Sequence, residues 1–258
     1  MSYPLLSLEG KTAVVIGGTT GIGFAIAQGL AQAGADVVPT SRRMPEVERA
    51  AAKMEELGRR TLRLSSDVSN KNSLIAVADA VVKTFGKVDI LINSAGITKK
   101  KATLDTTDEE WNAILDTNLT GTLRACQVFG RLMTERGYGR IVNIASLSSF
   151  VSLYQVAAYA ASKAAVASLT KSLAVEWARH GVCVNAIAPG VFRTALNSEL
   201  LDTTPRGQEF LLRTPMQRFG NVEELAGAAV FLSSDAASFV TGEVLVVDGG
   251  FLASGVNQ

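Results

Sequence analysis

The sequence is poor in residues that hold metals or form disulfides. Its 258 residues contain one histidine, His180, and two isolated cysteines, Cys126 and Cys183. A zinc site needs three or four His, Cys or carboxylate ligands close together, and the chain has no Cys/His cluster to supply them. Two distant cysteines in apolar surroundings favour buried thiols in a reducing compartment over a disulfide framework. We therefore expect a cytoplasmic protein without a metal.

The sequence also lacks an excess of charge of either sign. It has 25 Lys and Arg against 24 Asp and Glu, so its formal net charge is +1. A chain balanced in this way has no overall field that would draw it to nucleic acid or to an acidic membrane surface. Neither partner is therefore expected.

Long apolar segments are scarce. Residues 1–10 lack the basic region followed by an apolar stretch that marks a secretory signal. The uncharged run 141–162 is long enough to span a membrane, but it contains Asn143, Gln155 and repeated serines, which a bilayer core disfavours. A buried strand, a loop and a buried helix explain this run better. No stretch resembles a linker, so we expect a single domain over 1–258.

Short apolar runs rich in β-branched residues alternate with longer amphipathic segments. This alternation predicts βαβ units on a parallel sheet. The expected strands are 12–17, 36–40, 60–64, 89–93, 140–145, 182–188 and 243–247. The expected helices are 21–33, 45–57, 71–85, 107–136, 156–180 and 222–233. Together they predict an α/β fold with a doubly wound, seven-stranded parallel sheet and helices on both faces.

Glycines follow the first expected strand in the pattern Gly17-Gly-Thr-Thr-Gly21-Ile-Gly23. Glycine allows a sharp turn and a close approach of a ligand, and the N-terminus of the helix that follows attracts phosphate. A purely structural turn would use the same residues. Asp67 and the segment Asn93-Ser-Ala-Gly96 follow later strands along the same sheet edge, where doubly wound sheets bind their ligands. The pattern predicts a nucleotide site.

Tyr159 and Lys163 are separated by one helical turn, which points both side chains to the same place. A phenol has a pKa near about 10, and a fixed ammonium nearby lowers this value. The pair is therefore a candidate acid/base group. The alternative interpretation is a half-buried aromatic residue beside a solvated lysine.

The order and spacing of these motifs resemble the short-chain dehydrogenase/reductase family, in its single-domain Rossmann form, over essentially the whole chain. The matching positions are Gly17, Gly21, Gly23, Asp67, 93–96, Asn118, Ser146, Tyr159, Lys163, Asn185, Pro189 and Gly190. The resemblance implies hydride transfer between a nicotinamide cofactor and a carbonyl or alcohol. It assigns Tyr159 as the acid/base and Lys163 as the group that lowers the phenol pKa and holds the nicotinamide ribose. Ser146 would bond the substrate oxygen, and Asn118 would hold a water that connects Lys163 to solvent.

The same resemblance assigns the cofactor contacts. Asp67 would bond the adenine amino group, Val68 would pack on the ring, and Val191 and Thr194 would orient the carboxamide. The expected cofactor residues are Gly17, Thr19, Gly21, Ile22, Gly23, Ser41, Arg42, Arg43, Asp67, Val68, Asn93, Ala95, Gly96, Ile144, Tyr159, Lys163, Pro189, Gly190, Val191 and Thr194.

The end of the second strand distinguishes NADP from NAD. Ser41 stands where an NAD enzyme needs a carboxylate for the ribose 2′-hydroxyl, and Arg42 and Arg43 follow it. Small donors and cations suit a 2′-phosphate, so NADP(H) is expected in preference to NAD(H). Thr19 and Thr20 depart from the many NADP-using relatives that carry Arg or Lys in the glycine loop. The alternative is that the two arginines form a solvated pair.

The substrate is the least defined part of the prediction. Segment 195–219 corresponds to the family's mobile substrate lid. Ser148 and Ser149 are expected to satisfy loop backbone groups. The expected substrate residues are Ser146, Leu153, Gln155 and Tyr159.

Three functions are compatible with the sequence. The overall pattern, including Val247-Asp248-Gly249-Gly250-Phe251 at its end, is similar to that of sugar-acid and polyol oxidoreductases of the gluconate 5-dehydrogenase type. The second is a 3-oxoacyl-[acyl-carrier-protein] reductase, in which Arg136 and Arg179 near the pocket rim would dock an acidic carrier. The third is a catalytically silent NADP-binding regulator, although such relatives commonly lose the Tyr or Lys that this chain keeps. The resemblance also implies a homotetramer.

Overall fold

The computed structural model describes residues 3–194 and 198–255. Within them, six strands form one parallel sheet in the order β2-β1-β3-β4-β5-β6. The strands are β1 (Thr12–Ile16), β2 (Asp36–Thr40), β3 (Ile90–Asn93), β4 (Gly139–Ile144), β5 (Val182–Pro189) and β6 (Val244–Val247). The doubly wound α/β fold predicted from the sequence is therefore confirmed.

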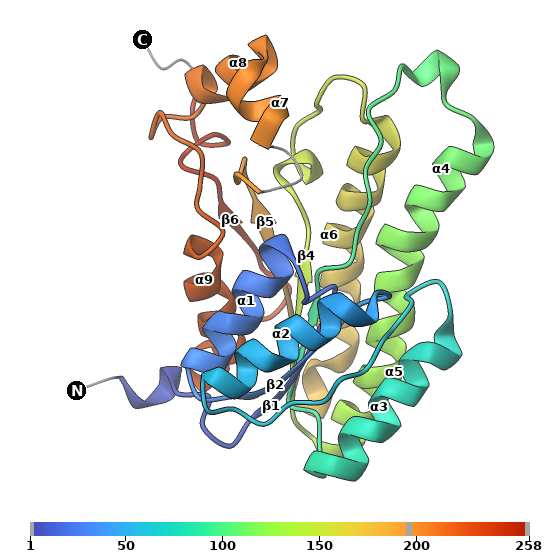
Figure 1. Ribbon diagram of the computed structural model, residues 1–258, viewed down its shortest axis with the longest axis vertical. Helices are drawn as coiled ribbons and strands as arrows, with labels where there is room; N and C mark the ends of the chain where they lie inside the picture. The colour runs from blue at the N-terminus through green and yellow to red at the C-terminus, as the bar shows by residue number, and fades with distance from the viewer. Residues whose placement is uncertain (1–2, 195–197, 256–258) are drawn as a thin grey trace.

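Helices cover both faces of the sheet (Figure 1). One face packs against α1 (Gly21–Gln32), α2 (Met44–Glu56) and α9 (Glu224–Ser233). The other packs against α3 (Lys71–Phe85), α5 (Gly121–Arg136) and α6 (Ala157–Trp177). Two short helices, α7 (Ser198–Thr203) and α8 (Pro205–Arg213), lie beyond one end of the sheet.

The strands are mostly apolar, because both faces of the sheet are covered. In β1, Ala13 and Val15 point into one core, whereas Val14 and Ile16 point into the other. All residues of β1, β3, β4 and β5 are buried. Continuous burial of this kind is typical of a parallel sheet between two helical layers.

The predicted strand 60–64 is wrong. This segment runs beside β2, where the amide of Val37 donates to its first carbonyl at 3.2 Å and an isolated bridge joins Ser41 to Ser65. In this register the next donor on β2 would be Pro39, which has no N–H. The ladder therefore cannot continue, and the described sheet has six strands instead of seven.

One other expected element differs from the structure, whereas the run 141–162 follows the course predicted for it. The helix expected over 107–136 is divided into α4 (Asp108–Leu115) and α5 by a π-helical segment, η3 (Asp116–Thr120). The segment 195–219 contains α7 and α8, and residues 195–197 lie outside the described residues. The run 141–162 divides into β4, a loop and the start of α6. In the described part of the chain, no helix has the length and apolarity to cross a membrane.

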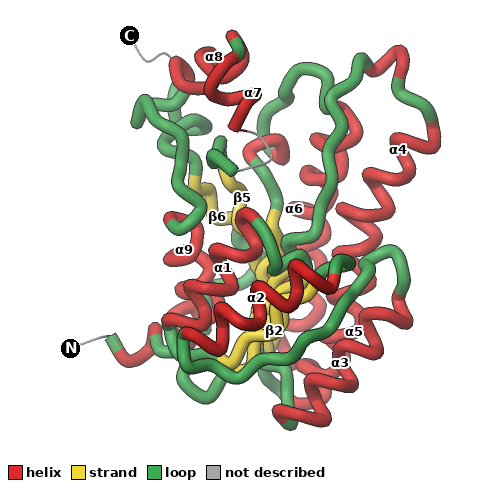
Figure 2. The backbone as a smooth tube through the Cα atoms, viewed as in Figure 1, coloured by secondary structure: helices red, strands yellow, loops and turns green. Residues whose placement is uncertain are grey.

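The strands, yellow in Figure 2, lie between the layers of helices. Their order reverses between β1 and β3, which are neighbours in the sheet although β2 separates them in the chain. The chain after β1 leads to α1 on one face of the sheet, and the chain after β3 leads to α5 on the other, so the two connections diverge from adjacent carboxyl ends. This reversal is where doubly wound sheets bind their ligands.

Candidate active site

One pocket of about 1000 Å³ occupies the carboxyl edge of the sheet. It extends from the glycine turn after β1 to the first turn of α6 and the helix α8. Most predicted site residues line it. They are Gly17, Thr19, Gly21, Ile22, Gly23, Ser41, Arg42, Arg43, Asp67, Val68, Ala95, Gly96, Ile144, Ser146, Leu153, Tyr159, Lys163, Pro189, Gly190, Val191 and Thr194.

The glycine turn fits against its neighbours so closely that a side chain has no room. Gly17 has φ +76°, and a Cβ there would lie 2.6 Å from the amide nitrogen of Ala95. A Cβ on Gly23 would lie 2.2 Å from the carbonyl oxygen of Gly17. Because both neighbours are backbone, neither can move aside. The turn therefore brings the N-terminus of α1 directly to the pocket, where its first amides can bind phosphate.

The same turn is bonded to the end of β2. The Gly17 amide donates to Thr40 O at 2.8 Å, and the Thr19 hydroxyl donates to the Ser41 hydroxyl at 2.8 Å. Arg42 follows on the surface and forms no ion pair with the described residues, whereas Arg43 lies 3.7 Å from Glu46. A cation and two hydroxyls thus adjoin the glycine turn.

Asp67 and Ser66 lie at the same end of the pocket. Hydrogen bonds from the Ser69 hydroxyl and amide lower the pKa of Asp67, and the positive charge of Arg42 lowers it further. The Ser66 hydroxyl is buried and has no partner among the described residues, although its residue lines the pocket. A buried donor without a partner is costly, so this wall suits a polar ligand.

Tyr159 and Ser146 face each other at the opposite end of the pocket from Asp67. Ser146 follows β4, and Tyr159 lies in the first turn of α6. Burial raises the pKa of Tyr159, and its hydrogen bond with Ser146 acts in the opposite direction. The net shift is upward. The phenol therefore keeps its proton at neutral pH.

Lys163 lies behind the phenol, and any lowering of the phenol pKa by its charge is outweighed by burial, which raises the pKa of Tyr159 on balance. The Nζ of Lys163 is 5.7 Å from the centroid of the Tyr159 ring and donates to Ile144 O at 2.6 Å. Burial lowers the pKa of Lys163 to about 8. An ammonium that is 5% exposed and bonded to a single carbonyl is poorly compensated, which explains the direction of this shift.

Asn118 is buried behind the pocket in the π-helical segment. Its amide group donates to Ile97 O at 2.9 Å and to the Ser162 hydroxyl at 3.0 Å, and its Oδ1 accepts from Ile97 N at 2.8 Å. The Thr122 hydroxyl caps the Asn118 carbonyl at 2.7 Å. Asn118 therefore fixes the chain after Gly96, which lines the pocket.

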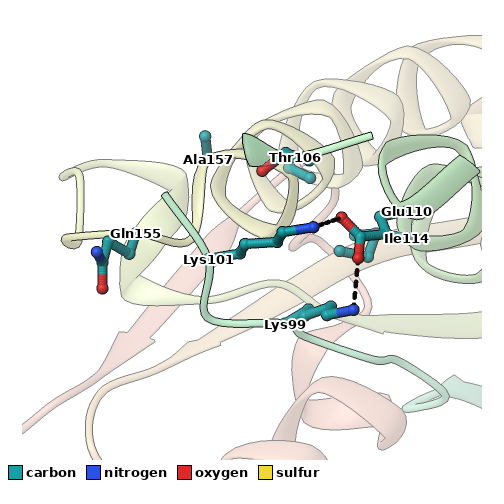
Figure 3. A pocket seen from close by; sticks show the side chains of 8 residues that line it. Lys99, Lys101, Thr106, Glu110, Ile114, Gln155 and Ala157 are labelled. Carbon is teal, nitrogen blue, oxygen red and sulfur yellow. Dashed lines mark hydrogen bonds and ion pairs between the residues drawn. The ribbon is translucent and has the colours of Figure 1, made fainter. Parts of the chain in front are cut away.

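Two other predicted residues lie outside the large pocket. Asn93 is buried and donates to Asn143 Oδ1 at 2.8 Å, within the sheet. Gln155 lines a separate hollow of about 10 Å³, too small for more than one water (Figure 3). Its backbone has φ +63°, a left-handed conformation that the sequence did not indicate. Gln155 therefore does not line the large pocket, and its role as a substrate residue stays a prediction.

The predicted set omits several polar residues of the pocket wall, among them Ser148, Lys100 and Arg206. Ser148 was expected to form a hydrogen bond with the backbone. Ser149 does so, because its hydroxyl donates to Lys163 O at 2.8 Å. The Ser148 hydroxyl instead has no partner among the described residues, and this buried residue lines the pocket. Lys100 and Arg206 also line it. No local pattern marks these three, because segments far apart in the chain bring them together.

Arg136 and Arg179 do not lie at the pocket rim. Arg136 pairs with Asp89 immediately before β3, and Arg179 lies in η5 (Ala178–His180), immediately before β5. Both positions are at the amino edge of the sheet, opposite the pocket. The proposed docking of an acidic carrier by these two residues is therefore wrong.

The buried Lys163 makes stability depend on pH. Its pKa is about 8 in the folded protein against 10.5 ordinarily, so between these values the unfolded chain binds more protons and stability rises with pH. Lys163→Met removes this dependence. Both proteins are compared without cofactor. The free energy of unfolding of the variant minus that of wild type is expected to be roughly 2–3 kcal/mol larger at pH 7 than at pH 10.

Urea unfolding at the two pH values measures this difference. Lys171→Met is the control, because Lys171 is exposed on the same helix. An equal effect of Lys163→Met at both pH values would contradict the shifted pKa.

Known proteins resemble this chain over its full length. The sequence profile of the family described as enoyl-(acyl carrier protein) reductase matches residues 17–252. The gluconate 5-dehydrogenase of Gluconobacter oxydans (strain 621H) is 40% identical over 255 residues, which are 98% of this chain and 100% of that protein. The 2-dehydro-3-deoxy-D-gluconate 5-dehydrogenase of Bacillus subtilis (strain 168) is 43% identical, with 97% and 98% covered.

A solved structure shows the same fold. The gluconate 5-dehydrogenase from Burkholderia cenocepacia J2315, in complex with NADP and tartrate, superposes with a TM-score of 0.93 at 37% identity. The superposition covers 97% of this chain and 98% of that one. With these relatives and the pocket at the strand reversal, the chain belongs to the short-chain dehydrogenase/reductase family and is an NAD(P)-dependent dehydrogenase acting on CH–OH groups.

Proposed function

We propose that the protein interconverts a keto group and a secondary alcohol of a sugar acid, with NADP(H) as cofactor and Tyr159 as acid/base. The observation that carries this proposal is the continuity of the pocket. One cavity joins the glycine turn and Arg42 to Ser146, Tyr159 and Lys163. A dinucleotide bound along the edge of the sheet would therefore end beside the phenol.

The residues at the first end fit a phosphorylated dinucleotide. Gly17 and Gly23 leave room for the pyrophosphate at the start of α1. Ser41 and Arg42 would hold the 2′-phosphate of NADP, because the end of β2 has no carboxylate to accept from a 2′-hydroxyl. Asp67 accepts hydrogen bonds from the described residues only at Oδ1, so its other oxygen is available to the adenine amino group.

The residues at the other end fit proton transfer to a carbonyl. Bound nicotinamide supplies the hydride in reduction and accepts it in oxidation. Tyr159, protonated at neutral pH, would donate to the carbonyl oxygen as the carbon is reduced. Ser146 would donate a hydrogen bond to the same oxygen and stabilise its developing charge. Lys163, whose pKa of about 8 leaves it mainly charged at pH 7, would stabilise the phenolate left behind.

Two observations support a sugar acid as substrate. Proteins about 40% identical to this chain are named for gluconate and its derivatives, and the Burkholderia enzyme was solved with tartrate, a hydroxylated dicarboxylate. Near the phenol, the pocket wall includes the unpartnered Ser148 hydroxyl and the cations Lys100 and Arg206. An oxygen-rich anion would satisfy these groups, whereas an acyl chain would leave them unpaired.

A substrate panel tests the proposed function. NADPH oxidation is measured with 5-keto-D-gluconate, neutral ketoses, simple ketones and acetoacetyl thioesters. The keto sugar acid is expected to have a kcat/KM at least about 10-fold above the others, because one charged hydrogen bond contributes about that factor. A preference for the thioester would reject the sugar-acid assignment in favour of an acyl reductase.

Tyr159→Phe tests the proposed acid/base. It removes the proton donor without removing the ring, so kcat is expected to fall by about 10²- to 10⁴-fold. NADPH affinity, measured by fluorescence, should change little. Tyr154→Phe is the control, because that side chain is 77% exposed and outside the pocket lining. Full activity of Tyr159→Phe would show that another group transfers the proton.

Arg42→Ala tests the preference for NADP. Losing a cation that bonds the 2′-phosphate is expected to lower kcat/KM for NADPH by about 10- to 100-fold and to leave that for NADH nearly unchanged. Arg49→Ala is the control, since Arg49 lies on α2 in an exposed pair with Glu46. If Arg42→Ala alters both cofactors equally, this residue does not discriminate between them.

A further inference from the structure

The charges around the pocket are unevenly distributed. Its one lining carboxylate is Asp67, whose pKa is lowered by the charge of nearby Arg42, so it lies at the cofactor end. At the Tyr159 end the lining includes Lys100 and Arg206, with no carboxylate. Neither cation has an ion pair among the described residues. Ligand chemistry at this end is therefore biased toward an anion.

Arg206 is held where it can reach such an anion. It is the second residue of α8, half-buried, and its Nη1 donates to Tyr154 O at 3.0 Å. The guanidinium carbon lies 5.5 Å from the centroid of the Phe210 ring, one helical turn further along. These two contacts restrict the side chain, which reduces the entropy lost when it binds a ligand.

The helix that carries Arg206 is anchored close to the proposed catalytic residues. Leu201 and Phe210 belong to an apolar cluster with Leu147, the residue directly after Ser146, and with Phe251 near the end of the described chain. Both Leu201 and Phe210 also line the pocket. The position of Arg206 is therefore set by packing against the loop that begins at Ser146.

Lys100 belongs to a segment that is bonded to the same loop before Tyr159. The amide of Lys101 donates to Gln155 O at 2.8 Å. This carbonyl is next in the chain to Tyr154 O, which accepts from Arg206. Lys99 and Lys101 both form ion pairs with Glu110, with Nζ–Oε distances of 2.5 and 2.7 Å (Figure 3). Lys100 alone of the three lines the large pocket and adds a second positive charge there.

We propose that Arg206 binds the carboxylate of the substrate and thereby determines the selectivity for acids over neutral sugars. This inference rests on the proposed function above. One N–H group of Arg206 is used by Tyr154 O, and the others have no partner among the described residues. A planar fork of N–H donors matches a carboxylate with two parallel hydrogen bonds, which an ammonium cannot reproduce.

The hydrogen bond to Tyr154 allows another role, in which Arg206 only fastens α8 over the pocket. The two roles differ in what they do to a substrate without a carboxylate. Loss of a fastener would impair all substrates alike. Loss of a carboxylate ligand would impair acids selectively and mainly through KM.

The experiment compares 5-keto-D-gluconate with L-sorbose, which carries a hydroxymethyl group in place of the carboxylate and the same keto group. Steady-state rates are measured at saturating NADPH for wild type, Arg206→Gln, Arg206→Lys and Arg213→Gln. Arg213 is the matched control, because it lies on the same helix and contacts the Phe251 ring, outside the pocket lining. NADPH affinity by fluorescence verifies that each variant is folded.

Arg206→Gln is expected to lower kcat/KM for the acid by about 10- to 100-fold, mainly by raising KM, and to change that for L-sorbose by less than about 3-fold. Arg206→Lys should recover part of the loss, and Arg213→Gln should resemble wild type. Equal losses on both substrates, or no loss on either, would overturn the inference while leaving the proposed function intact. A wild-type enzyme without preference for the acid would reject the proposed function itself, and the inference with it.

Discussion

The pocket depends on how closely the glycine turn after β1 approaches the strands on either side. The amides of Gly17 and Gly18 both donate to Thr40 O, at 2.8 and 3.2 Å, which joins the turn to the end of β2. On the other side, Gly17 lies so close to the backbone of Ala95 that any side chain would collide. These contacts place the start of α1, the end of β2 and the end of β3 around one cavity. A looser turn would separate the first amides of α1 from Ser41 and Arg42 at the end of β2.

At the other end of the pocket, polar groups are buried with little compensation. Lys163 is bonded to a single carbonyl, and the hydroxyl of Ser148 has no partner among the described residues. Such groups destabilise the cofactor-free fold, as the lowered pKa of Lys163 indicates. The same groups are then ready for a ligand without rearrangement. This part of the protein is organised for binding at the expense of stability.

The rigidity of this end comes from a local irregularity in a helix. Asn118 lies in the π-helical segment between α4 and α5. This conformation is rare in proteins as a whole, but where it occurs it is often at a functional site. Its side chain exchanges two hydrogen bonds with Ile97 and donates a third to Ser162, on α6. The chain after β3 is thereby fixed to the helix that carries Tyr159 and Lys163. The family resemblance pointed to Asn118, but not to the three hydrogen bonds that its side chain forms.

Much of the fold and pocket could be predicted because the signals were local. Alternating apolar runs indicate strands buried on both faces, and glycines before a helix indicate a phosphate turn. The failures have equally specific causes. Residues 60–64 look like a strand, but the missing N–H of Pro39 on β2 stops the ladder. Arg136 and Arg179 were assigned to the wrong edge, although residues that end a helix just before a strand must lie at the amino edge in a parallel sheet.

The sequence by itself determined six strands of the sheet, the glycine turn after β1 and the Tyr159/Lys163 spacing, since each depends on neighbouring residues. It also identified the family and with it the class of reaction. Only the tertiary structure decided which side chains from distant segments line the pocket. Arg206 lines the pocket because α8 packs on Leu147 and Phe251, whereas Gln155 lines a separate hollow with Thr106 and Glu110. Both outcomes depend on contacts between distant segments, which no local pattern records.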